Sequence, residues 1–79
     1  MQGNFTIHIY PNPSSGSLHI SSLQKILTVT IRNSYGQQVL YAKPNSQSAT
    51  FNVSRFKPGV YFTTTETING FAYDKIIVR

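Results

Sequence analysis

The chain contains no cysteine, two acidic residues and no long apolar run. Without cysteine it can form neither a disulfide framework nor a cysteine metal site, so packing alone must hold its core. No stretch approaches the roughly 20 apolar residues that span a bilayer, and the first residues lack the basic and apolar regions of a signal peptide. The sequence therefore predicts one small domain, residues 1–79, that neither inserts into a membrane nor exports itself as given.

The scarcity of acids also limits catalysis. Hydrolytic acid/base chemistry generally needs two positioned groups with shifted pKa values, and Glu66 and Asp74 are the only carboxylic side chains. In the register expected for the last hairpin they are diagonal neighbours on one face, about 7–8 Å apart. That place is an open strand end with no cleft implied. The sequence therefore predicts no catalytic residue and no enzyme.

The chain also has few residues that could bind a metal or a cofactor. His8 and His19 are the only imidazoles, and both occupy polar positions of alternating segments, which predicts surface placement. Zinc needs three or four ligands, and no nearby acid or thiol completes the set. The sequence contains neither a nucleophile elbow nor a phosphate-binding glycine loop. We expect no metal and no cofactor.

The few acids leave a net charge of +5, which by itself favours an anionic partner such as a nucleic acid. However, the seven cations are spread singly along the chain, and Arg55 and Lys57 are the only near neighbours. A surface that follows a phosphate backbone would cluster them. We interpret the charge as a solvated basic surface and expect no nucleic-acid partner; a nucleic-acid-binding barrel is the least favoured alternative.

The chain is rich in serine, threonine and aromatic residues, whereas alanine occurs three times and methionine once. β-branched and aromatic side chains favour pleated, half-buried surfaces over helices. Apolar and polar residues alternate with period two, most cleanly over residues 27–32. Seven short strands at this spacing are typical of an immunoglobulin-like antiparallel β-sandwich. The expected strands are residues 5–10, 18–20, 27–32, 38–41, 50–53, 60–66 and 71–78.

The expected register of the last hairpin follows from parity. If Val60 and Phe62 share the buried face with Ile76 and Val78, opposed residue numbers must sum to an even number, which requires a three-residue loop at 68–70. Phe62 then lies opposite Ile76. The expected buried residues are Ile7, Ile9, Leu18, Ile20, Leu27, Val29, Ile31, Phe51, Val53, Phe56, Val60, Phe62, Ile76 and Val78.

Three motifs in order resemble the C-terminal sorting domain of the type IX (Por) secretion system of Bacteroidetes. A short strand runs into Tyr-Pro-Asn-Pro at residues 10–13, Gly-x-Tyr stands at 59–61, and an apolar strand ends on a basic residue at 79. The resemblance spans the chain from about Ile7 to Arg79. Two departures are Phe56, where the family commonly carries leucine, and the polar run at residues 63–65. The matching positions are Tyr10, Pro11, Asn12, Pro13, Gly16, Gly36, Gly59, Tyr61, Lys75, Ile76, Ile77, Val78 and Arg79.

The resemblance implies a non-catalytic secretion signal. Such a domain is recognised by the secretion machinery at the outer membrane, directs an attached upstream cargo through the periplasm and across that membrane, and is usually removed by a sortase-like signal peptidase. The cargo is then secreted or held at the cell surface. Met1 is accordingly expected to be an introduced start, with the domain excised from the end of a larger secreted protein.

Among the matching residues, Pro11, Pro13, Gly36 and Gly59 suit particular backbone angles, so they support the fold at least as much as recognition. The terminal strand, residues 75–79, is expected to differ. A strand at a sheet edge offers free backbone groups to a partner. We therefore expect it to be the recognition element.

The main alternative is an immunoglobulin-like carbohydrate-binding accessory module of a secreted enzyme. In the expected register Tyr61 and Tyr73 share the outward face of the last hairpin, where aromatic rings can stack on sugars. This alternative stays open on the sequence alone.

Overall fold

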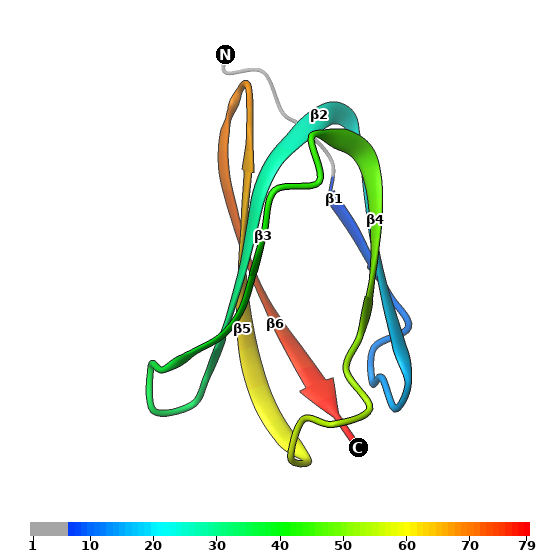
Figure 1. The fold of residues 1–79 in the computed structure, drawn as a ribbon, viewed down its shortest axis with the longest axis vertical. Helices are drawn as coiled ribbons and strands as arrows, with labels where there is room; N and C mark the ends of the chain where they lie inside the picture. The colour runs from blue at the N-terminus through cyan, green and yellow to red at the C-terminus, as the bar shows by residue number, and fades with distance from the viewer. Residues whose placement is uncertain (1–6) are drawn as a thin grey trace.

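A computed structural model describes residues 7–79, and its regular structure there is entirely β (Figure 1). No helix occurs within these residues, so none there is long and apolar enough to cross a membrane. The expected all-β antiparallel class is confirmed, whereas Met1 and the start of the first expected strand at Phe5 lie outside the described residues. The strands are β1 (Ile7–Tyr10), β2 (Ser17–Asn33), β3 (Gln38–Ala42), β4 (Ser46–Asn52), β5 (Gly59–Thr67) and β6 (Gly70–Val78).

Six strands occur instead of the expected seven because β2 joins two of them. Its first half pairs with β1 and β4, and its second half pairs with β3 and β5. Figure 1 shows β2 rising from one end of the molecule, bending at the other end and descending again. The first layer therefore has the order β1-β2-β4 and the second has the order β3-β2-β5-β6. One bent sheet makes both layers of the sandwich.

At the bend, the set of β2 residues that faces the core changes from even-numbered to odd-numbered positions. Leu18, Ile20 and Ile26 are fully buried at even positions, whereas Val29 and Ile31 are fully buried at odd positions. The ladder with β5 shifts register between Ile26 and Thr28, and such a bulge moves the following side chains to the other face. Leu27, expected in the core, is therefore only half-buried.

The expected register of the last hairpin is wrong by one residue. Tyr61 pairs with Ile76, and Phe62 pairs with Lys75. Tyr61, expected on the solvent face of β5, is 6% exposed, and Phe62, expected in the core, is 47% exposed. The two faces of β5 are therefore exchanged relative to the expectation. Val60 is exposed for the same reason.

The turn between β5 and β6 explains this register. Thr67 pairs directly with Gly70, which leaves the two-residue turn Ile68-Asn69 in place of the expected three-residue loop. The Thr67 hydroxyl accepts a hydrogen bond from the Asn69 N–H (3.1 Å) and donates one to the Gly70 carbonyl (3.2 Å). An odd sum of paired residue numbers then places Tyr61, rather than Phe62, inside.

The core combines aliphatic residues from β2 and β6 with an unusual row of threonines from β5. Thr63, Thr65 and Thr67 are all buried, and their branched shape suits a pleated surface. The Thr65 hydroxyl has no hydrogen-bond partner among the described residues, which costs stability. Ile7, Ile9, Phe51 and Phe56, also expected in the core, are half-buried and pack against it. The buried apolar set is Leu18, Ile20, Ile26, Val29, Ile31, Val53, Tyr61, Ile76 and Val78.

Candidate recognition surface

Four separate segments meet at one end of the sandwich, which we call the motif end (Figure 1). They are the β1–β2 connection, the β2–β3 hairpin loop, the β4–β5 loop and the end of β6. The far end carries the bend of β2, the β3–β4 connection and the β5–β6 turn. β1 begins at the far end, so the chain enters the domain away from the motif end. The three motifs singled out in the sequence therefore converge at one end of the molecule.

The first motif lies against the outer edge of the last strand. Ser14 donates its N–H to the carbonyl of Ile77 (2.8 Å), and its carbonyl accepts the N–H of Arg79 (2.8 Å). The Asn12 side chain continues this ladder, since its Oδ1 accepts the Ile77 N–H (3.0 Å) and its Nδ2 donates to the Lys75 carbonyl (3.2 Å). The amide of Asn12 thus substitutes for a backbone peptide group. We call these four hydrogen bonds the edge clasp.

The segment that forms the clasp is itself held in place. The Tyr10-Pro11 and Asn12-Pro13 peptide bonds are both cis, and the Ser14 hydroxyl, which is buried, donates to the Pro11 carbonyl. Ser14 forms a parallel bridge with Val78. Asn12, one of the matching residues of the first motif, therefore contacts β6 directly, and Ser14 beside it does the same.

The edge clasp corrects one expectation about the terminal strand. β6 is the edge strand of its layer, as expected, but the backbone groups of Ile77 and Arg79 that face away from β5 are not free. A partner strand must displace Asn12 and Ser14 before it can pair there. This contact is not readable in the sequence, because Asn12 and Ile77 are 65 residues apart.

Asn12→Ala is expected to speed hydrogen exchange of the Ile77 amide about tenfold, because that N–H loses its hydrogen-bond acceptor. The Ile76 amide is expected to change little, because successive residues of a strand point to opposite sides and Ile76 faces β5. Amide exchange followed by NMR measures both. Asn12→Asp is the control, since it keeps an oxygen for the Ile77 N–H. Equal exchange in wild type and Asn12→Ala would show that the clasp does not form in solution.

The second motif also makes contacts within the fold. The Tyr61 hydroxyl donates to the Lys57 carbonyl (2.6 Å), and its ring packs on Phe56 with 5.1 Å between the ring centroids. Gly59 has a φ of 152°, a region that favours glycine. Tyr61 thereby ties the β4–β5 loop to the core.

The carbohydrate alternative loses its platform in this arrangement. Tyr61 is buried, whereas Tyr73 lies opposite Thr64 on the outward face and is 73% exposed. The two rings therefore lie on different faces of the sheet. Tyr73 instead stacks with Phe71 at 6.4 Å between centroids.

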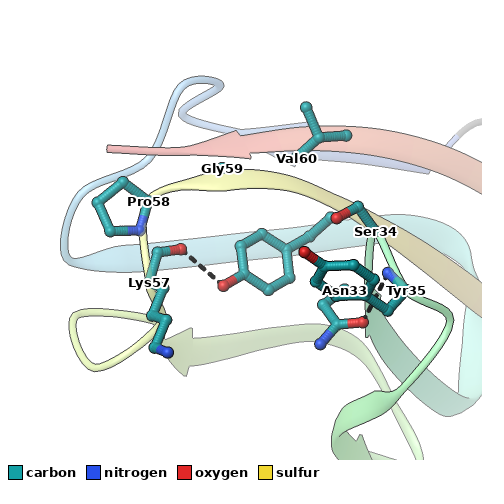
Figure 2. A pocket seen from close by; sticks show the side chains of 8 residues that line it. Asn33, Ser34, Tyr35, Lys57, Pro58, Gly59 and Val60 are labelled. Atoms are coloured by element: carbon teal, nitrogen blue, oxygen red, sulfur yellow. Dashed lines mark hydrogen bonds between the residues drawn. The ribbon is translucent and has the colours of Figure 1, made fainter.

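A cleft of about 330 Å³ opens at the motif end between the β2–β3 hairpin loop and the start of β5 (Figure 2). The Asn33 carbonyl oxygen Oδ1 accepts the N–H groups of Tyr35 (2.9 Å) and Gln37 (3.0 Å), which fixes one wall. Gly36 completes that hairpin loop with a φ of 84°. The eight described residues that line the cleft include one cation, Lys57, and no acid.

The two carboxylates do not form the expected pair. Glu66 lies opposite Phe71 and accepts a hydrogen bond from the Thr28 hydroxyl (3.1 Å), whereas Asp74 lies opposite Thr63. Because Thr63 faces inward, the two acids lie on opposite faces of the hairpin. Burial raises the pKa of Asp74 above its ordinary value.

The histidines are likewise separate from any ligand cluster. A ring nitrogen of His19 lies 2.9 Å from the Thr50 hydroxyl, and the ring stacks on Tyr10 at 5.2 Å between centroids. His8 is exposed, while His19 is half-buried. Within residues 7–79 no three histidine or acidic side chains come together in a way that suits a metal ion.

Comparisons with known proteins agree with the fold. A family model described as the secretion system C-terminal sorting domain matches residues 8–79. No curated protein matches. Among solved structures, one chain superposes with a TM-score of 0.76 at 20% identity, covering 92% of this chain and 11% of that chain. It comes from a study of PorZ, an essential bacterial surface component of the type-IX secretion system of Porphyromonas gingivalis. At this identity the likeness concerns the fold alone.

Proposed function

The chain belongs to the secretion system C-terminal sorting domain family, and on that premise we propose that it is the C-terminal signal of a larger secreted protein. The family's domains target proteins to type IX secretion, which implies export across the outer membrane to the cell surface or beyond. The cargo, on this proposal, is covalently attached upstream. It passes through the periplasm, and a sortase-like signal peptidase removes the domain at the outer membrane.

The observation that carries the proposal is the family match over residues 8–79, together with the meeting of its three motifs at one end. The chain enters β1 at the far end, so an upstream cargo leaves the motif end open to the machinery. The family is one of secretion signals, and we assign the domain no catalytic step.

We assign recognition first to the terminal residues 75–79. Ile76 and Val78 are buried, so a partner that leaves the fold intact reads the outward side chains of Lys75, Ile77 and Arg79. Side chains are the better candidates here because the edge clasp occupies the outer backbone groups of this segment.

The domain, fused to the C-terminus of a reporter exported to the periplasm, is expected to carry that reporter to the surface or medium of a bacterium with a type IX system. Deletion of residues 75–79 is expected to trap it in the periplasm. Cell fractionation and blotting measure both outcomes. The deletion also removes Ile76 and Val78 from the core, however, so unfolding alone would block export.

A short tag after Arg79 separates recognition from folding. We expect it to leave the melting temperature nearly unchanged and to block export, because the end of β6 becomes covered. Equal export with and without the tag would refute the proposal that the secretion machinery recognises the terminal residues 75–79. Failure of the untagged fusion to leave the periplasm of a competent host would count against the sorting function itself.

A further inference from the structure

The fold gathers cations that are dispersed in the sequence. Arg55 and Lys57 lie in the β4–β5 loop and Arg79 follows β6, all at the motif end (Figure 1). Arg32 and Lys75 both lie opposite Phe62 on β5, so all three side chains share the outward face of the sheet. Three of the seven cations thus lie in the segments that form the motif end, and two more share the outward face with Phe62.

The remaining charges lie elsewhere. Lys25 is at the bend of β2 and Lys43 is in the β3–β4 connection, both at the far end. Glu66 is one residue before the end of β5, next to the far-end turn, and Asp74 is in the middle of β6. Neither acid therefore lies in the segments that form the motif end, whereas Arg55, Lys57 and Arg79 do.

The motif end also has the shape and composition of a protein-binding surface. Tyr10 and Tyr35 are exposed there, the latter by 88%, and Arg55 and Arg79 are exposed at the same end. Tyrosine and arginine are the residue types over-represented among energetically important interface positions. Figure 2 shows Lys57 and Tyr35 on opposite sides of the cleft, which Tyr61 also lines.

We propose that the motif end docks an acidic protein segment, with a partner carboxylate entering the cleft beside Lys57 while Arg55 and Arg79 flank it. This inference rests on the proposed function and identifies the chemistry of the machinery component that reads the signal. A protein partner fits better than a lipid surface, because Lys57 lies at a cleft of side-chain size that Tyr35 and Tyr61 also line, rather than on a flat face. Charge complementarity of this kind fixes orientation and speeds association.

The test uses two matched double charge reversals in the reporter fusion. Arg55→Glu with Lys57→Glu changes the motif end, and Lys25→Glu with Lys43→Glu changes the far end. Each single substitution of a cation by glutamate lowers the net charge by two, so each double variant falls from +5 to +1. All four side chains are exposed, so the melting temperatures are expected to stay close to wild type.

We expect export of the motif-end variant to fall about tenfold or more and export of the far-end variant to stay within about twofold of wild type. An equal loss in both variants would show that net charge alone matters and would overturn the proposal, as would no loss in either. If the wild-type fusion itself stays in the periplasm of a competent host, the proposed function fails first.

A binding measurement gives an independent result. Titration of the labelled domain with a hexaglutamate peptide is expected to shift amide resonances of residues 33–36 and 55–59, and the motif-end variant is expected to lose these shifts while the far-end variant keeps them. Vesicles of phosphatidylglycerol serve as the second probe. Binding to the vesicles without binding to the peptide would overturn the proposal in favour of a lipid surface.

Discussion

Replacing Tyr61 by alanine is expected to lower the free energy of unfolding by about 3–5 kcal/mol, whereas Phe62→Ala is expected to cost about 1 kcal/mol or less. Tyr61 is buried, packs on Phe56 and holds the Lys57 carbonyl, while Phe62 is half in solvent on the outward face. Urea denaturation of the three proteins, analysed with a common slope, measures the difference.

Tyr61→Phe divides the larger effect into its parts. It keeps the ring and removes the hydrogen bond to the Lys57 carbonyl, so we expect a loss of about 1 kcal/mol. If Phe62→Ala lowered the free energy of unfolding more than Tyr61→Ala, the pairing of Tyr61 with Ile76 would be contradicted. The result would instead support the expected pairing of Phe62 with Ile76.

This register shows where sequence reasoning reached its limit. Along β5 the phase with Val60 and Phe62 inside is the more hydrophobic one, so a rule based on burial of apolar side chains selects it. The structure selects the other phase because Tyr61 finds a partner for its hydroxyl, and because the Thr67 hydroxyl supports a two-residue turn. Both reasons depend on contacts that alternation does not reveal.

The strand content was more predictable than the strand count. Alternation located most of the β residues, because a half-buried strand imposes period two on its sequence. It missed the start of β4, which begins at Ser46 and not at the expected Thr50, because residues 46–48 are all polar and exposed. The same criterion divided β2 into two strands, because the alternation fails between Ser21 and Ile26, where the ladder with β4 is interrupted. A bend can interrupt the pattern without ending the strand.

The residues of the candidate surface could be identified from the sequence, but their meeting at one end of the fold could not. The three motifs are readable in the sequence, but their meeting depends on strand direction: connections made after an up strand and after a down strand lie at opposite ends. Because β2 bends back on itself, both of its ends lie at the motif end. The bend therefore brings the β1–β2 connection and the β2–β3 hairpin loop to the same end as the end of β6.

Two neighbouring residues of the terminal strand are expected to behave differently. Ile76→Ala should lower the free energy of unfolding by about 2–5 kcal/mol, because Ile76 is fully buried opposite Tyr61. Ile77→Ala should cost about 1 kcal/mol or less, because that side chain is partly exposed and the edge clasp binds only its backbone. Thermal and urea unfolding of both variants measure this.

The substitutions Ile76→Ala and Ile77→Ala also distinguish an effect on folding from an effect on recognition of the terminal strand. If the outward side chains are read, Ile77→Ala lowers export of the reporter fusion while its melting temperature stays close to wild type. Ile76→Ala lowers export only as far as it unfolds the domain, so a lower growth temperature should restore it. Equal destabilisation by the two substitutions would mean that β6 does not hold Ile76 inward, and the assignment of Lys75, Ile77 and Arg79 as the readable side chains would then fail with it.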